Sequence, residues 1–166
     1  MPVGKLLIAN RGEIAIRIAR AAEELGIPSV AIYSTDDHSS LHTKMASESH
    51  ALEGSGVSAY LNIEHIVDTA IATGCDAVHP GYGFLAENAD FAAALENAGL
   101  TFVGPEASQL ALFGNKVSAR ELAAKLGVPL VPATAGSTSV EDVEAFLEEH
   151  QAIMIKAVAG GGGRGM

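Results

Sequence analysis

A run of glycines near the end of the chain could bind phosphate. Gly160–Gly163 are followed by Arg164, and Lys156 precedes them. Glycine reaches positive φ angles and has no Cβ, so successive backbone N–H groups can surround phosphate oxygens. The run lacks the Lys-Ser/Thr ending of a P-loop, and its composition is equally typical of a flexible linker. The two flanking cations and the apolar run before the glycines favour a phosphate-binding loop.

The stretch His79–Asn88, with the sequence HPGYGFLAEN, is a second candidate site. It follows an apolar run that predicts a strand, and ligands of open α/β sheets bind at the carboxyl ends of strands. Two glycines and a proline so close together indicate a specific backbone conformation. Taken singly, His79 and Tyr82 are more often structural than catalytic. Glu87 and Asn88 could cap the next helix.

Four charged residues share a predicted helix at a spacing that allows ion pairs. Glu13–Arg17 and Arg20–Glu24 are both i,i+4 pairs. Exposed pairs of this kind contribute only about 0.3–0.5 kcal/mol each. A solvated helix face and a polar subunit interface both fit the pattern.

Alternating strands and helices would position these residues. Strands are predicted at 5–9, 29–33, 76–79 and 101–103, with another ending at 51–52; helices are predicted at 14–25, 62–73 and 88–98. Short links between them indicate a doubly wound, mostly parallel α/β sheet of the Rossmann-like type. After the first strand only Gly12 is present, so the glycine fingerprint of nicotinamide-dinucleotide domains is missing.

The pattern changes near Phe113, where we expect a domain boundary that divides residues 1–113 from 114–166. The last helix before it is predicted at 105–113, and beyond it the sequence predicts helices at 116–126 and 139–149, with Ser139 as a possible N-cap, and a strand at 153–156. So few elements rarely bury a core of their own. The second part therefore reads as the incomplete start of a domain.

Composition excludes several classes of protein. Of the 166 residues 48% are hydrophobic, and the net charge of −10 argues against nucleic-acid binding. The acids between Glu141 and Glu149 are expected on a solvated helix face. Cys75 is the single cysteine, which allows no internal disulfide and fits a small buried residue. With no apolar run of about 18 residues and no leader-like N-terminus, we expect a cytoplasmic protein without membrane contact.

Four stretches, read together, resemble one family. They are Ile8–Arg17 (IANRGEIAIR), His79–Asn88, Gly114–Arg120 (GNKVSAR) and Ile155–Met166 (IKAVAGGGGRGM). In their order, spacing and residue identities they resemble the biotin carboxylase component of acetyl-CoA, propionyl-CoA and pyruvate carboxylases. The resemblance runs from Lys5 to the last residue. It implies a Rossmann-like pre-ATP-grasp domain followed by the start of an ATP-grasp domain with a mobile lid.

The resemblance also implies an activity. Members of this family use ATP and Mg²⁺ to activate bicarbonate by way of carboxyphosphate, and then carboxylate a biotin. The biotin is attached to a biotin carboxyl carrier protein or domain, a carboxyltransferase receives the carboxyl group, and the enzyme forms a homodimer. Electrostatic stabilisation by cations and bare amides suits such phosphoryl transfer.

Site residues follow from the resemblance residue by residue. It implies ATP contacts for Lys116 and Lys156, on the phosphate or the adenine side, and places Gly162 and Gly163 in the lid loop. It places Tyr82 and Gly83 in the biotin pocket, and Arg17, Arg20 and Glu24 in the dimer interface. One departure is Ala159, where the family continues its glycine run; we infer no loss of function from it.

The family's magnesium carboxylates, bicarbonate-binding arginine and general base lie beyond Met166. We therefore expect this chain to be an N-terminal fragment that is inactive by itself. Two alternatives stay open. Another ATP-grasp ligase, of the carbamoyl-phosphate or purine-pathway synthetase type, shares the architecture, although the His79–Asn88 stretch argues against it. A noncatalytic dimerisation or assembly module is the other.

Overall fold

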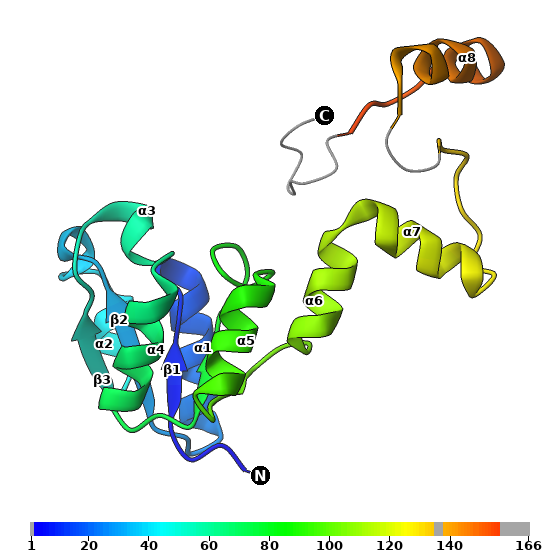
Figure 1. Ribbon diagram of the computed structural model, residues 1–166. Coiled ribbons are helices and arrows are strands. Elements are labelled where there is room, and N and C mark those ends of the chain that lie inside the picture. The colour runs from blue at the N-terminus through cyan, green and yellow to red at the C-terminus, as the bar shows by residue number, and fades with distance from the viewer. Residues whose placement is uncertain (1, 135–137, 157–166) are drawn as a thin grey trace. The chain divides into compact units, whose positions relative to one another are not determined.

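The computed structural model describes residues 2–134 and 138–156. The chain divides into two compact units, Met1–Leu110 and Ala111–Met166. Helix α6 (Ala107–Gly114) contains this division as well as the predicted boundary after Phe113 (Figure 1).

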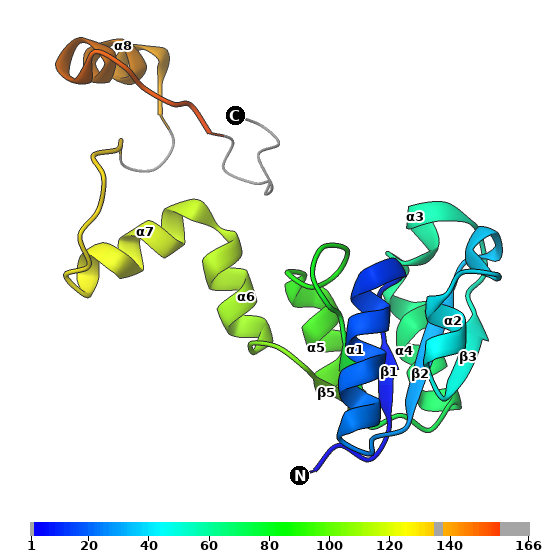
Figure 2. The ribbon, with the colours of Figure 1, turned by 180° about the vertical axis from the view of Figure 1, so that it is seen from behind.

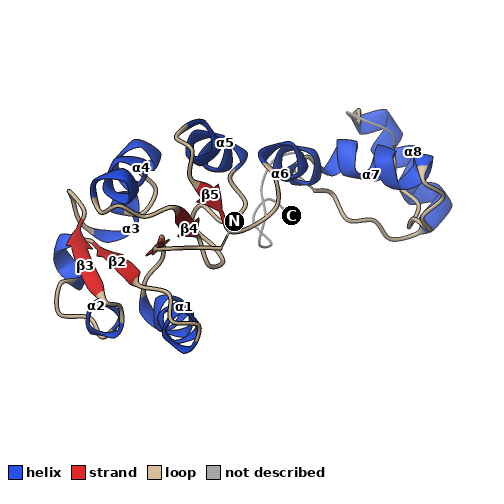
Figure 3. Ribbon diagram, turned by 90° about the horizontal axis from the view of Figure 1, so that it is seen from below, coloured by secondary structure: helices blue, strands red, loops and turns tan. Residues whose placement is uncertain are grey.

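The first unit contains a five-stranded, fully parallel sheet in the order β3-β2-β1-β4-β5. The strands are β1 (Leu6–Ile8), β2 (Ser29–Tyr33), β3 (Glu48–Ala51), β4 (Ala77–His79) and β5 (Thr101–Phe102). Helices α1 and α2 lie on one face, and α3, α4 and α5 lie on the other (Figure 3). The predicted doubly wound sheet is therefore confirmed. The chain runs from β1 through β2 to β3 at one edge of the sheet, and then forms β4 and β5 on the other side of β1 (Figure 2).

Helices α1 (Gly12–Glu24), α4 (Ile63–Ala72) and α5 (Ala89–Asn97) form where the apolar spacing predicts them. The sequence did not predict the 3₁₀ turn η1 (Thr35–Asp37) or the short helices α2 (His42–Met45) and α3 (Gly56–Ala59), because elements of three or four residues are too short to show an apolar period. The side chain of Asn62 caps α4, and that of Asn88 caps α5 by accepting from the Phe91 N–H at 2.8 Å. The cap predicted at residues 87–88 is thus confirmed for Asn88.

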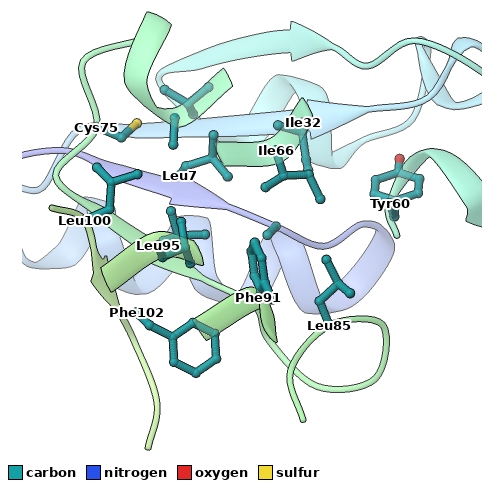
Figure 4. Close-up of a cluster of buried hydrophobic side chains, with 14 of the residues drawn as sticks. Leu7, Ile32, Tyr60, Ile66, Cys75, Leu85, Phe91, Leu95, Leu100 and Phe102 are labelled. Carbon is teal, nitrogen blue, oxygen red and sulfur yellow. The ribbon is translucent and has the colours of Figure 1, made fainter. Parts of the chain in front are cut away.

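Alternate residues of the strands supply two cores, one on each face of the sheet. Leu7 and Val78 point into the larger core with α4 and α5, whereas Leu6, Ile8 and Ala77 pack against α1. Period-two alternation of a pleated strand explains this division. Figure 4 shows the larger core, which also contains Cys75, Tyr60, Leu85, Phe91 and Phe102. Cys75 is buried, as its position predicts.

The second unit contains α7 (Lys116–Lys125) and α8 (Val140–His150) after the end of α6. Ser139 and Asp142 form the capping box of α8, which confirms the predicted N-cap. None of the described residues of this unit is buried, and apolar side chains such as Val131 and Met154 are largely exposed. The predicted strand at 153–156 is wrong for the described residues, because no neighbouring segment pairs with it.

Asp76 ties the segment before β1 to the segment before β4. Its carboxylate accepts hydrogen bonds from the backbone N–H groups of Lys5 at 3.0 Å and Gly4 at 2.8 Å, and these lower the pKa of the carboxyl. A lowered folded-state pKa stabilises the fold above the unfolded pKa of about 3.9, and this stability is lost as pH falls through the folded value.

Asp76→Asn is therefore expected to lose less stability on acidification than the unmodified chain. The measurement is the difference in urea midpoint between about pH 7 and about pH 3, where linkage predicts a smaller difference for the variant. Asp68→Asn, an exposed change on α4, is the matched control. Equal acid sensitivity of Asp76→Asn and the unmodified chain would contradict the expectation.

Candidate functional site

The carboxyl ends of the neighbouring strands β1 and β4 bring two sequence motifs together. Residues 10–14 follow β1 and residues 80–84 follow β4, so both lie at the same edge of the sheet. They enclose an open hollow of about 490 Å³, lined by Asn10, Arg11, Gly12, Glu13, Ile14, Tyr82, Gly83 and Phe84. This is the edge at which ligands of open α/β sheets bind.

Asn10 joins the two motifs. Its side chain is buried, and its Nδ2 donates to the backbone oxygens of Pro80 at 2.7 Å and Tyr82 at 3.0 Å. Its Oδ1 accepts from the N–H of Arg11 at 2.9 Å. One side chain therefore fixes the start of the β4 loop against the start of α1.

The β4 loop has an uncommon backbone. Gly81 and Gly83 have φ angles of +67° and +71°, and Phe84, which is not a glycine, has +38°. At Gly81 an added Cβ would lie 2.5 Å from Cγ2 of Ile14 and 2.8 Å from Nδ2 of Asn10. The specific conformation that the sequence predicts is present, and at Gly81 it requires glycine for both the φ angle and the space.

This loop presents Tyr82 to solvent. The Tyr82 side chain is 63% exposed, and its hydroxyl donates to the carboxylate of Glu13 in the first turn of α1. That hydrogen bond raises the pKa of Tyr82. The side chain does not pack into the core, so the interpretation of Tyr82 as a packing residue is wrong. Its aromatic ring lines the hollow together with Gly83.

His79 has the structural role that its residue type favours. Its Nδ1 accepts from the N–H of Gly81 at 3.0 Å, and burial lowers the pKa of the imidazole. The ring therefore stays neutral near pH 7 and keeps its acceptor for the loop backbone. His79 acts on the conformation of the β4 loop.

A polar cluster at the end of β2 escaped the sequence analysis. Asp37 accepts from Arg11 Nη1 at 3.0 Å, from the Tyr60 hydroxyl at 2.9 Å and from Ser40 Oγ at 3.0 Å. Partial burial opposes ionisation of Asp37, but these hydrogen bonds outweigh it and lower the pKa of the carboxyl. Burial raises the pKa of Tyr60 to about 12.

The signal for this cluster was present in the sequence but weak. Arg11 follows β1 and the polar turn 34–37 follows β2, so the parallel topology brings them to one edge. Nothing in the sequence shows that Tyr60, which directly follows α3, contacts both Asp37 and Arg11.

The charged residues of α1 do not form the predicted i,i+4 pairs. In the part of the chain that the structure describes, neither Glu13–Arg17 nor Arg20–Glu24 is an ion pair, and Glu13 accepts from Tyr82 instead. Arg17, Arg20 and Glu24 are all exposed on α1. Long side chains on a solvated helix gain little from pairing, which accounts for the difference.

The residues predicted for ATP belong to the second unit. Lys116 is the first residue of α7, after the capping Asn115, and is partly exposed; Lys156 is exposed at the end of the described range 138–156. Gly162 and Gly163 lie outside the described residues. Tyr82 and Gly83, the residues predicted for biotin, belong to the first unit.

Two further observations concern metals and membranes. Within residues 2–134 and 138–156, no group of three or more His, Cys, Asp or Glu side chains is arranged to hold a metal ion. Among those same residues no helix is long and apolar enough to cross a membrane.

Two family descriptions match consecutive parts of the chain. Residues 2–110 match "Biotin carboxylase, N-terminal domain", and residues 115–166 match "Carbamoyl-phosphate synthase L chain, ATP binding domain". The first match covers most of the chain and includes the hollow between β1 and β4.

Relatives agree along nearly the whole chain. Biotin carboxylase 1 of Bacillus subtilis is 50% identical over 99% of this chain, and pyruvate carboxylase of Staphylococcus aureus is 52% identical over 99%. This chain spans only 37% and 15% of their respective lengths.

Solved structures agree as well. The biotin carboxylase domain of a single-chain bacterial carboxylase has a TM-score of 0.85 at 51% identity, covering 89% of this chain and 34% of that chain. The biotin carboxylase domain dimer of Hydrogenobacter thermophilus 2-oxoglutarate carboxylase, in complex with MgADP and bicarbonate, has a TM-score of 0.90 at 44% identity; the match covers 99% of this chain and 37% of that chain. The chain therefore belongs to the biotin carboxylase family and corresponds to the N-terminal part of its members.

Proposed function

We propose that this chain is the N-terminal part of a biotin carboxylase, an ATP-dependent ligase that carboxylates carrier-bound biotin with bicarbonate. The observation that carries the proposal is the agreement of nearly the whole chain with 15–37% of the length of several carboxylases. A carrier protein or domain and a carboxyltransferase would be its partners in the complete enzyme.

On the ATP side, the proposed contacts are Lys116, Lys156, Gly162 and Gly163, within residues 114–166. The match of 115–166 to an ATP-binding domain supports this placement. ATP would supply the phosphoryl group that activates bicarbonate, and lysine charges would offset the negative charge of its phosphates. The resemblance to the biotin carboxylases, one of which is solved in complex with MgADP, supports the further proposal that the ligands of Mg²⁺ lie outside residues 1–166.

On the biotin side, the proposed pocket residues are Tyr82 and Gly83. The β4 loop supports this role, because Asn10 fixes its start and Tyr82 stands exposed beside the hollow. The Tyr82–Glu13 hydrogen bond sets the direction of the hydroxyl. Gly83 lacks a side chain, so a ligand can approach the backbone closely there.

We also propose that the complete protein is a homodimer with Arg17, Arg20 and Glu24 in its interface. These side chains are exposed on one stretch of α1, and none forms an ion pair within the described part of this chain. They are therefore available to a partner subunit. The solved relative from Hydrogenobacter thermophilus is described as a dimer.

The test compares this chain with a longer protein that contains it. Phosphate release from ATP is measured with Mg²⁺ and bicarbonate, with and without free biotin. We expect biotin-stimulated release by the longer protein and none above buffer by residues 1–166 alone. Lys156→Gln in the longer protein is expected to lower kcat/KM for ATP by about tenfold or more, as loss of one charged phosphate contact does.

Two outcomes would contradict the proposal. Release by the longer protein that biotin does not stimulate would favour another ATP-grasp ligase. A stable dimer of the longer protein by light scattering, together with an unchanged Tm when MgATP is added to it, would favour a noncatalytic assembly module, because a ligand that binds the native state raises Tm.

A further inference from the structure

Phe84 stands out in the backbone of the β4 loop. Its φ angle is +38°, and among the described residues that are not glycine only Gln151 also has a positive φ. Such strain persists only where surrounding contacts impose it, and it gathers at functional sites. The contacts of the Phe84 side chain therefore indicate the role of the β4 loop.

Tyr60 provides the main contact. The two rings stack with centroids 5.3 Å apart and planes inclined by 4°. Tyr60 is completely buried, and Phe84 is partly buried against the same core. Offset-stacked aromatic pairs at this separation attract each other beyond their burial of area.

The ring of Tyr60 is itself held at its far end. Its hydroxyl donates to Asp37 Oδ2 at 2.9 Å and accepts from the N–H of Ser34 at 3.2 Å. The guanidinium of Arg11 lies 5.8 Å from the ring centroid and also bonds to Asp37. These contacts fix the Tyr60 ring at the carboxyl ends of β1 and β2, and the Phe84 ring stacks on it.

The two ends of the loop are thus anchored separately. Asn10 holds the backbone oxygens of Pro80 and Tyr82, and Tyr60 holds the ring of Phe84. Leu85, the next residue, is buried in the larger core (Figure 4). Phe84 packs against the same core and also lines the hollow together with Tyr82 and Gly83. The strained residue therefore forms part of the wall of the hollow.

We propose that Tyr60 and Phe84 are positioning residues of the biotin site: their stack holds the Tyr82–Gly83 turn in the geometry that receives biotin. This inference rests on the proposed function. Neither residue needs to touch the reacting atoms. Removal of the stack loosens the turn, and a displacement of about 1 Å in a positioning element costs up to about 100-fold in rate.

The test uses the longer protein, with steady-state kinetics in which biotin and ATP are varied separately. Phe84→Leu keeps an apolar side chain but removes the stack. We expect its KM for free biotin to rise about tenfold, with the KM for ATP within about twofold of the unmodified protein, because only the biotin wall moves. Phe84→Tyr keeps the ring, and we expect its KM for free biotin to equal that of the unmodified protein.

Phe102→Leu is the matched control. Phe102 is buried and makes an edge-on contact with Phe91 at 5.9 Å, so this variant also loses an aromatic pair, but away from the loop. It is expected to lower Tm without a change in the biotin KM. A Phe84→Leu protein that behaves in the same way would overturn the inference while leaving the proposed function intact.

A second readout needs no catalysis and uses residues 1–166. The N–H of Ala86 donates to the backbone oxygen of Gly83 at 2.8 Å, so hydrogen exchange at Ala86 reports opening of the turn. We expect about tenfold faster exchange there in Phe84→Leu than in Phe102→Leu. Equal rates would overturn the positioning role. No biotin stimulation in the unmodified longer protein would overturn the proposed function, and this inference with it.

Discussion

Gly81→Ala is expected to lower the free energy of unfolding of the chain by about 3 kcal/mol. The φ angle of +67° costs about 1–2 kcal/mol for a residue with a Cβ. The clash adds about 1–3 kcal/mol, as overpacking does. Ile14 cannot move its Cγ2 easily, because its branch is at Cβ, and Asn10 is held by its hydrogen bonds.

Gly99→Ala separates these two contributions. Gly99 has a similar φ of +75°, but an added Cβ would meet nothing within 4 Å. We therefore expect it to cost only about 1 kcal/mol, the conformational part alone. Urea unfolding followed by far-UV circular dichroism measures both variants. Equal losses would show that the close approach of Ile14 and Asn10 to Gly81 does not affect stability.

Asn10→Leu has the second large expected effect, a loss of about 2–3 kcal/mol in the free energy of unfolding. Leucine has nearly the shape of asparagine, so no cavity opens. The backbone oxygens of Pro80 and Tyr82 lose their donor at 2.7 and 3.0 Å, and a buried polar group without a partner costs about 1–3 kcal/mol. The same urea measurement applies.

Asn62→Ala is the control for Asn10→Leu, since Asn62 only caps α4 by accepting from the His65 N–H. Loss of an N-cap costs about 1 kcal/mol. If Asn10→Leu cost no more than this, the carbonyls of the β4 loop would not depend on Asn10. The effects of Gly81→Ala and Asn10→Leu are expected to be non-additive, because a Cβ added at Gly81 would lie against the side chain of residue 10.

These predictions concern one loop because the candidate site depends on it. Asn10, Gly81 and Tyr60 each fix a different part of the segment that carries Tyr82. A ligand site gains affinity from such preorganisation, because less freedom is lost on binding. The stability of the loop and the affinity of the site are therefore linked.

Local sequence patterns predicted most of the strands and the longer helices of the first unit. The period of apolar residues in α1, the cap at Asn88 and the apolar run of β1 all depend on neighbours in the chain, and the structure confirms them. The parallel direction of the strands followed from the short links between alternating strands and helices. The family also followed from the sequence, because its motifs are contiguous.

Two predictions failed because their outcome depends on distant residues. A strand at 153–156 requires a neighbour to pair with, and no described segment provides one. The i,i+4 pairs of α1 are spaced correctly, but Glu13 accepts from Tyr82 instead, 69 residues away in the sequence. Spacing shows which contacts are possible, and competition among partners decides which ones form.

Patterns along the chain were enough to predict the parallel sheet, helices α1, α4 and α5, and the family to which the chain belongs. The three-dimensional structure was needed to show that Asn10 binds the β4 loop, that Tyr60 stacks on Phe84, and that Tyr82 is exposed beside Glu13. The difference lies in the range of the interactions. Hydrophobic period and helix caps act over a few residues, whereas the site consists of hydrogen bonds and ring contacts between the ends of three parallel strands.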